Sequence, residues 1–224
     1  SALWPANAVL LGLMLRNPAL MSPGGWVAGA AGFVAADLLS GSPWSIAVSL
    51  SLVNLLSVFV ALTMSLRLTQ AQRHRVTPDA LAPLFLSILG ASLAAGITGA
   101  AVLWHLRAAP FAEVATRWAV TELLAYIIVL PCVLSAPPVH VIFSRRGVRS
   151  FLDNIPLFLV TLASLGVVLM ASITIGGPGV IAFPVCALLV VALICSFFTT
   201  ALLTLFVSLW TLLGIAFGGI QVPF

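Results

Sequence analysis

Four polar side chains stand inside strongly apolar stretches of the sequence, and their types allow them to bind a ligand or one another: Asn7, Asp37, Asn54 and Glu122. Inserting a charged side chain at the centre of a bilayer costs about 2.5–3.5 kcal/mol on insertion scales. We therefore expect such a residue to have a bonding partner or a function. Asn54 and Glu122 each lie roughly ten residues below the outer end of a predicted helix, which places them at a similar depth at about 1.5 Å per residue.

Aromatic and basic residues extend this polar set. Trp118 precedes Glu122 by four residues and shares its helix face, as Glu113 and Arg117 share another. We expect an outward-opening polar pocket that receives a small-molecule signal, lined by Trp4, Asn7, Asp37, Asn54, Arg117, Trp118 and Glu122. The alternative is that these groups satisfy one another as contacts between helices, with Arg117 pairing with Glu113 at the membrane interface.

Residues that would serve an enzyme lack the partners they need, so we expect no enzymatic activity, cofactor or metal in this chain. The sequence has no Lys, which excludes a Walker A loop and a Schiff base with pyridoxal phosphate or retinal. No HExxH or GxSxG occurs. Ser92 belongs to a face of small residues and is expected to pack. His105 and His140 are predicted at opposite sides of the membrane, so they cannot share a haem iron.

The composition indicates a membrane protein. Of 224 residues, 62% are hydrophobic and 6% are charged, whereas a soluble domain carries about 25% charged residues. The basic residues are all Arg and are spread over predicted loops, so nucleic acid is not an expected partner. The cysteines, expected to be packed thiols because they lie in apolar runs without CxxC spacing, are Cys132, Cys186 and Cys195.

Apolar runs bounded by Pro, Gly and Arg predict an all-α, polytopic bundle of about eight transmembrane helices. We expect one integral-membrane domain over residues 1–224. The predicted helices cover residues 2–15, 25–41, 44–66, 80–105, 112–135, 154–173, 179–196 and 199–217. The turn signal at residues 196–200 is weak, so one long helix over 179–217 is the alternative to the last pair.

Arginine placement predicts the orientation, because basic residues in short loops are retained in the cytoplasm. The loops after the first, third and fifth predicted helices hold Arg16, Arg67, Arg73, Arg75, Arg145, Arg146 and Arg149, and the opposite side keeps Arg107 and Arg117. Both chain ends are then expected to face outward. Because the chain lacks an initial Met and a leader, we expect a fragment of a longer protein.

Small residues at helical spacing predict close helix contacts. One such face carries Gly25, Ala28, Gly29 and Gly32, and another carries Ser92, Gly96 and Ala100. Packing within one protomer is the first interpretation, and homodimerisation through these faces is the second.

Several short motifs resemble the membrane-associated sensor domain family, type one (MASE-type integral-membrane input domains). These are Trp4-Pro5-Ala6-Asn7-Ala8 with Arg16, Asn54 in the third helix, Arg117-Trp118 with Thr121-Glu122 and Leu130-Pro131, and the segment 218–224. The chain departs from the family pattern at Ala8, where Gly is usual, at Glu122, where Asp is common, and at Ala125-Tyr126, where a Gly is often found; the family's Arg-Phe-Gly turn near residues 196–200 is missing.

The resemblance implies a sensory input domain of the bacterial inner membrane, joined in cis to a cytoplasmic output domain such as a histidine kinase or a cyclic-di-GMP enzyme. It implies a signal-transduction role in which ligand binding shifts a helix bundle between two arrangements, with the lipid bilayer and a second copy of the chain as partners. A small-solute transporter or permease subunit is the competing interpretation, although no internal repeat supports it. A structural membrane scaffold is the third.

Overall fold

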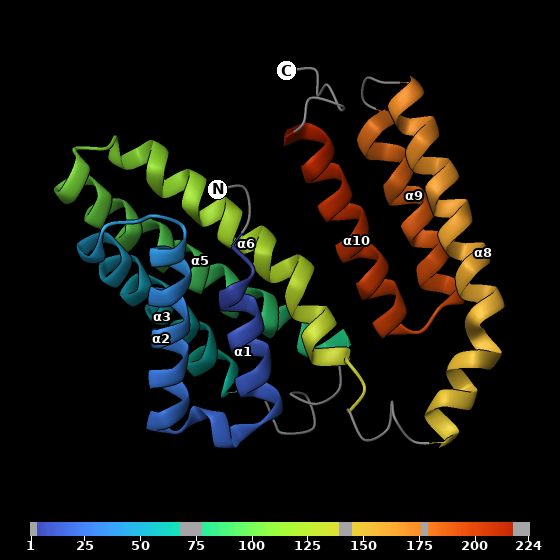
Figure 1. The fold of residues 1–224 in the computed structure, drawn as a ribbon, viewed down its shortest axis with the longest axis horizontal. Coiled ribbons are helices and arrows are strands. Elements are labelled where there is room, and N and C mark those ends of the chain that lie inside the picture. The colour runs from blue at the N-terminus through green and yellow to red at the C-terminus, as the bar shows by residue number, and fades with distance from the viewer. Residues whose placement is uncertain (1–3, 68–77, 139–144, 176–178, 217–224) are drawn as a thin grey trace. The chain divides into compact units, whose positions relative to one another are not determined.

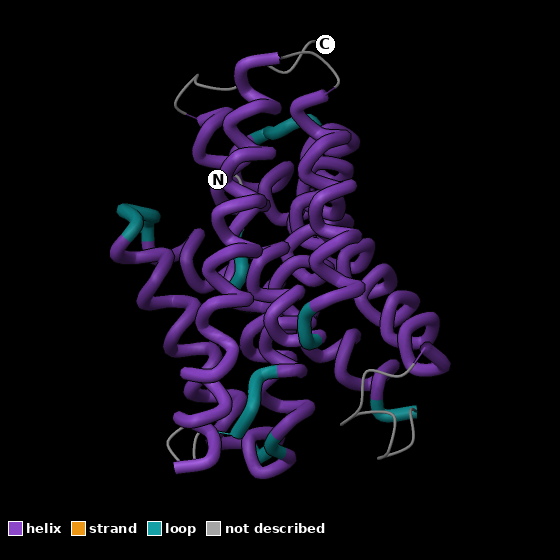
Figure 2. The backbone as a smooth tube through the Cα atoms, turned by 90° about the vertical axis from the view of Figure 1, so that its right-hand side faces the viewer, coloured by secondary structure: helices purple, strands orange, loops and turns teal. Residues whose placement is uncertain are grey.

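A computed structural model of the chain describes residues 4–67, 78–138, 145–175 and 179–216. The secondary structure in these ranges is helical throughout, as Figures 1 and 2 show. The α-helices are α1 (Ala6–Arg16), α2 (Pro23–Leu39), α3 (Trp44–Ser65), α5 (Pro78–Arg107), α6 (Phe111–Ser135), α8 (Arg145–Ile175), α9 (Gly179–Ile194) and α10 (Phe197–Ala216), with a 3-10 turn η1 (Pro18–Met21) after α1. The expected all-α helix bundle is confirmed.

The chain divides into two compact units, Ser1–Leu134 and Ser135–Phe224. The first unit contains α1, η1, α2, α3, α5 and nearly all of α6, and the second contains α8, α9 and α10. The expectation of one sensory domain over the whole chain stays a prediction.

Proline, glycine and serine set the helix ends close to the predicted positions. Pro23 occupies the first turn of α2, where its missing N–H costs nothing. Gly41 adopts a φ of 82° in the turn before α3, a conformation that favours glycine. Ser196 separates α9 from α10, and its Oγ accepts a hydrogen bond from the backbone N–H of Thr199 at 3.3 Å. Residues 179–216 therefore form two helices. The largest difference from prediction is at α8. The predicted helix covers residues 154–173, whereas α8 begins at Arg145 and so includes the Arg-rich segment before it.

Four of the described helices are long and apolar enough to cross a membrane: Trp44–Ser65, Leu81–Arg107, Phe111–Ser135 and Phe197–Ile215. Many large apolar side chains on the helix surfaces are exposed, among them Val27, Leu52 and Leu193. Such surfaces are unfavourable in water and are compatible with lipid. The chain is therefore a membrane protein.

Helix α3 lies at the centre of the first unit and packs against α1, α2 and α5. Its contact face is lined by small and apolar residues, including Ala47, Val58 and Ala61, which are buried. Because small residues let helix backbones approach closely, all three helices can pack against α3. This arrangement brings the polar residues of α3 into contact with other helices.

Glycines allow α6 to approach α5 and α1 within the same chain. A Cβ added at Gly96 of α5 would lie 2.6 Å from the backbone oxygen of Ala115, and one added at Gly12 of α1 would lie 2.6 Å from the Val133 side chain. Ser92 and Ala100 on the Gly96 face are buried. The small-residue face of α5 thus packs inside one protomer, as its first interpretation predicts.

Only part of the small-residue face of α2 packs against another helix. A Cβ at Gly29 would lie 2.8 Å from the Leu10 side chain of α1, whereas one at Gly32 would meet nothing within 4 Å. Ala28 and Gly32 are exposed. Homodimerisation through this face stays a prediction.

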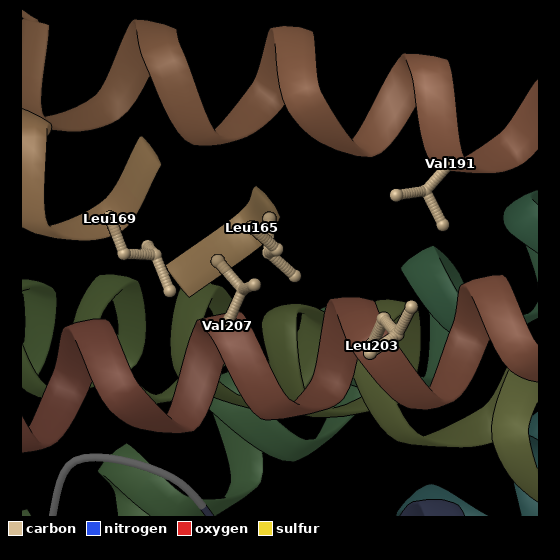
Figure 3. Packing of buried hydrophobic residues seen from close by; sticks show 5 residues of the cluster. All are labelled: Leu165, Leu169, Val191, Leu203 and Val207. Carbon is tan, nitrogen blue, oxygen red and sulfur yellow. The ribbon is translucent and has the colours of Figure 1, made fainter. Parts of the chain in front are cut away.

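The second unit has its own apolar core, formed by Leu165 and Leu169 of α8, Val191 of α9, and Leu203 and Val207 of α10 (Figure 3). Because α9 is apolar on all sides, its sequence pattern does not distinguish a core face from a lipid face.

The prediction of packed thiols needs a correction for one cysteine on α9. Cys132 is buried and Cys195 is half-buried, but Cys186 is exposed. All three are free.

Candidate functional site: a buried polar cluster

Asn7 joins three helices through its side-chain amide. Its Nδ2 donates to Oδ1 of Asn54 on α3 at 3.1 Å and to Oε1 of Glu122 on α6 at 2.6 Å. The structure therefore brings together three of the residues that the sequence places in the site.

Two further residues, absent from the predicted set, complete the network. Oγ of Ser57 donates to Oε1 of Glu122 at 2.8 Å and lies 3.0 Å from the hydroxyl of Tyr126. Ser57 follows Asn54 by three residues and Tyr126 follows Glu122 by four, so each shares a helix face with a predicted residue. That spacing is the signal that identifies them. We call Asn7, Asn54, Ser57, Glu122 and Tyr126 the polar cluster.

The polar cluster is enclosed by protein. Its side chains are at most 5% exposed, and those of Ser57 and Tyr126 are among the most deeply buried in the chain. Hydrogen bonds in such a water-poor environment are strong, and an unpaired polar group there is costly. The cluster is closed in this conformation, and the predicted outward opening stays a prediction.

The helices place the cluster well inside the first unit. Asn54 lies near the middle of α3 and Glu122 near the middle of α6, which are both long enough to cross a membrane. Asn7 lies in the first turn of α1, a helix of 11 residues. At about 1.5 Å per residue, α1 reaches only half as far as a full transmembrane helix, so its N-terminal end meets the other helices at mid-depth.

Arg16 attaches the other end of α1 to the same partner helix. Its Nη1 donates to the backbone oxygen of Val133 at 2.6 Å. Val133 lies in the last turn of α6, whose final carbonyls have no partner within the helix. Helix α1 is thus bonded to α6 at both ends, through Asn7 and through Arg16.

The remaining predicted residues do not hydrogen-bond to the cluster. Arg117 is exposed and forms an ion pair with Glu113 at 2.9 Å, the arrangement given by the alternative interpretation. Trp118 is half-buried, and its ring lies against Gly99 of α5. Asp37 lies near the C-terminal end of α2. Trp4 directly precedes the first turn of α1.

Buried polar atoms without a hydrogen-bond partner mark positions that a ligand or water could satisfy. Among the described residues they are Trp4 Nε1, Asn7 Oδ1, Asp37 Oδ2, Ser51 Oγ and Ser65 Oγ. Leaving such an atom unpaired costs about 1–3 kcal/mol. Trp4 Nε1 is a donor and Asn7 Oδ1 is an acceptor, and both belong to the N-terminal end of α1.

Two observations concern groups that catalysis would use. The residues described contain no group of three or more His, Cys, Asp or Glu that could hold a metal ion. Ser92, which the sequence places in a face of small residues, is buried, and its hydroxyl donates to the backbone oxygen of Ile88 in its own helix at 2.7 Å.

Some sequence predictions fall on residues that the structure does not describe. They are the loop arginines Arg73 and Arg75, His140, and the family-like segment 218–224. The side chains of Arg145, Arg146 and Arg149 also lie outside the described part.

Comparisons with family models, with curated proteins and with solved structures found no match to this chain. The resemblance to membrane-associated sensor domains therefore stays a prediction from the sequence motifs.

Proposed function

We propose that this chain is a membrane-embedded signal-input domain of a bacterial inner-membrane signalling protein, and that the polar cluster is its receptor site. The observation that supports the proposal most directly is the network of Asn7, Asn54 and Glu122, which joins three helices through hydrogen bonds of one amide. A signal that alters these bonds acts on all three helices at once.

Helix α1 is the element through which a change at the polar cluster would be passed on. This short helix is bonded to α6 through Asn7 at one end and Arg16 at the other. A ligand that binds Asn7 in one arrangement more tightly than in another shifts the population of the bundle by that difference in affinity. The shift then passes to a cytoplasmic output domain in cis, such as a histidine kinase or a cyclic-di-GMP enzyme.

The unpaired donor of Trp4 and the unpaired acceptor of Asn7 define the chemistry of a ligand. A hydrogen-bond acceptor on a small molecule can satisfy Trp4 Nε1, and a donor can satisfy Asn7 Oδ1. Water at this position is the simplest such molecule. The proposed signal is therefore a small polar molecule that enters between α1, α3 and α6.

The output activity of the full-length protein in membrane vesicles tests this proposal. We expect Glu122→Gln and Asn54→Leu each to change signal-dependent output severalfold while membrane insertion is kept. Glu113→Gln is the matched control, because Glu113 lies on the same helix but is exposed and bonds only to Arg117. Normal output from both cluster variants would overturn the proposal.

The full-length gene product provides a second test. A crossing helix and a catalytic output domain after residue 224 support relay in cis. A product that ends without an output domain contradicts the relay and favours the transporter alternative, in which the same cluster would bind a transported solute.

A further inference from the structure

The hydrogen atoms of the polar cluster leave one acceptor unfilled. Both hydrogens of the Asn7 amide are used, one on Asn54 and one on Glu122. The Ser57 hydrogen is used on Glu122. The Tyr126 hydroxyl lies 3.0 Å from Ser57 Oγ and also hydrogen-bonds to the Glu122 carboxyl. Oδ1 of Asn7 is buried and receives no hydrogen bond from the described residues. One more hydrogen atom would complete the network.

Glu122 is the candidate donor of that hydrogen, because its carboxyl already contacts the same amide. Oε1 accepts from both Asn7 and Ser57, Tyr126 also hydrogen-bonds to the carboxyl, and the second oxygen, Oε2, takes part in neither the Asn7 nor the Ser57 bond. A carboxylic acid and a primary amide form a cyclic pair, in which the amide N–H donates to one carboxyl oxygen and the acid O–H donates to the amide oxygen. The Asn7–Glu122 contact is one half of such a pair.

We propose that Asn7 and Glu122 form a proton-binding site, in which protonated Glu122 donates from Oε2 to Oδ1 of Asn7. In the binding step, hydronium from the aqueous phase transfers one proton to Oε2 and leaves as water, and the reverse step returns the proton. Only its use as a signal input rests on the proposed function; the protonation itself stands independently.

The surroundings of Glu122 favour the neutral pair. An unpaired charge inside a membrane bundle is unfavourable, and ionisable residues there are typical of proton relays. Helix α3 has no ionisable residue, and α1 has none before Arg16 at its far end. The described ionisable side chains on the other helices of this unit are Tyr126 in the cluster, Glu113 and Arg117 at the exposed end of α6, Cys132 near the C-terminal end of α6, His105 and Arg107 in the last turn of α5, and Asp37 on α2. Among the described residues, Glu113 forms an ion pair with Arg117, whereas Glu122 forms no ion pair.

Release of the proton would change what holds α1. The ionised carboxylate can no longer donate to Asn7, so one bond between α1 and α6 is lost and a negative charge remains among apolar helices. Both effects favour an arrangement that lets water reach Glu122. Proton release is thus coupled to the first turn of α1, the part of the bundle that Asn7 anchors to α3 and α6.

The sequence makes a direct measurement of the proton practical, because the chain contains only two glutamates, Glu113 and Glu122. We propose to label glutamate with 13C at the side-chain carboxyl and to record NMR and infrared spectra of the chain in lipid nanodiscs at neutral pH. We expect one ionised and one protonated carboxyl. Glu113→Gln should remove the ionised signal and leave the protonated one. Two ionised carboxyls at neutral pH would overturn the proposal, and this outcome needs no variant at Glu122.

An Asn7→Leu variant tests whether Asn7 accepts the hydrogen bond from the protonated carboxyl of Glu122. Leucine removes both bonds of the cyclic pair, so the carbonyl stretch of protonated Glu122 should move to higher frequency. Ser49→Ala is the control, because Ser49 is half-buried on α3 and its hydroxyl bonds only to the backbone of its own helix. An unchanged carbonyl stretch in Asn7→Leu would show that the proton does not lie on the Asn7 pair.

The proton site and the proposed function fail in different experiments. If Glu122 is ionised at neutral pH while Asn54→Leu alters output, the proton site is overturned and the receptor proposal remains. If Glu122 is protonated while Glu122→Gln and Asn54→Leu both signal normally, the receptor proposal is overturned and the proton site remains. If both hold, Glu122→Gln should make the output independent of pH, because glutamine keeps a permanent donor toward Asn7.

Discussion

Asn7 Nδ2 lies 2.6 Å from Oε1 of Glu122, although 115 positions separate the two residues in the chain. This bond connects the first turn of α1 to the middle of α6. Because Asn7 also donates to Asn54, a single side chain holds three helices together. The stability of the first unit should therefore depend on Asn7 more than on any exposed polar residue of these helices.

Replacing Asn7 by leucine should lower the free energy of unfolding by about 1–2 kcal/mol, because Asn54 and Glu122 lose their donor while they stay buried. Unfolding in detergent measures the change, and Ser49→Ala provides the control, because the Ser49 hydroxyl bonds within its own helix and joins no other helix. Equal stabilities for the two variants would show that the network does not hold the helices together.

Tyr126→Phe removes only the hydroxyl that lies 3.0 Å from Ser57. We expect a loss of about 0.5–1.5 kcal/mol in unfolding free energy, the usual net value of one hydrogen bond. The same variant should also alter the signal of labelled Glu122, because the Tyr126 hydroxyl contacts Ser57 and hydrogen-bonds to the Glu122 carboxyl. A spectrum identical to that of the original chain would separate Tyr126 from the cluster.

Gly96→Ala tests the close contact between α5 and α6. The new Cβ would lie 2.6 Å from a backbone oxygen of α6, which cannot rotate away as a side chain can. We expect a loss of about 1–3 kcal/mol in stability. Gly32→Ala, where nothing lies within 4 Å, should be neutral or slightly stabilising because alanine favours helix.

Leu203→Ala should create a cavity in the core of the second unit, between α8, α9 and α10 (Figure 3). A loss of about 2 kcal/mol or more is expected from comparable core truncations. Leu193→Ala on α9 is the matched control, because Leu193 is 88% exposed. Similar unfolding midpoints for the two variants would contradict the packing of this core.

Arg117→Ala tests whether the Arg117–Glu113 pair matters to the site. The side chains of the two residues are 75% and 63% exposed, and exposed ion pairs contribute about 0–1 kcal/mol. We expect a small change in stability and an unchanged spectrum of labelled Glu122. A large shift in that spectrum would show that Arg117 interacts with the polar cluster.

Much of the fold can be predicted from the sequence because few backbone conformations are stable in lipid. Without water, backbone N–H and C=O groups must bond within a helix or a closed barrel, so long apolar runs between Pro, Gly and Arg predict helices and their ends. The predicted helices at 44–66 and 112–135 therefore agree closely with α3 and α6. The Arg-rich start of α8 was missed because a helix can continue through residues that are too polar for the bilayer.

The polar character of the site was also visible in the sequence, since Asn7, Asn54 and Glu122 interrupt apolar runs. Only the tertiary structure decided which polar residues meet, because the rotation and depth of each helix depend on how its small residues let neighbours approach. Those contacts bring Ser57 and Tyr126 into the cluster and leave Arg117 at an exposed surface. Helix spacing identifies the face of a residue, and packing decides what that face touches.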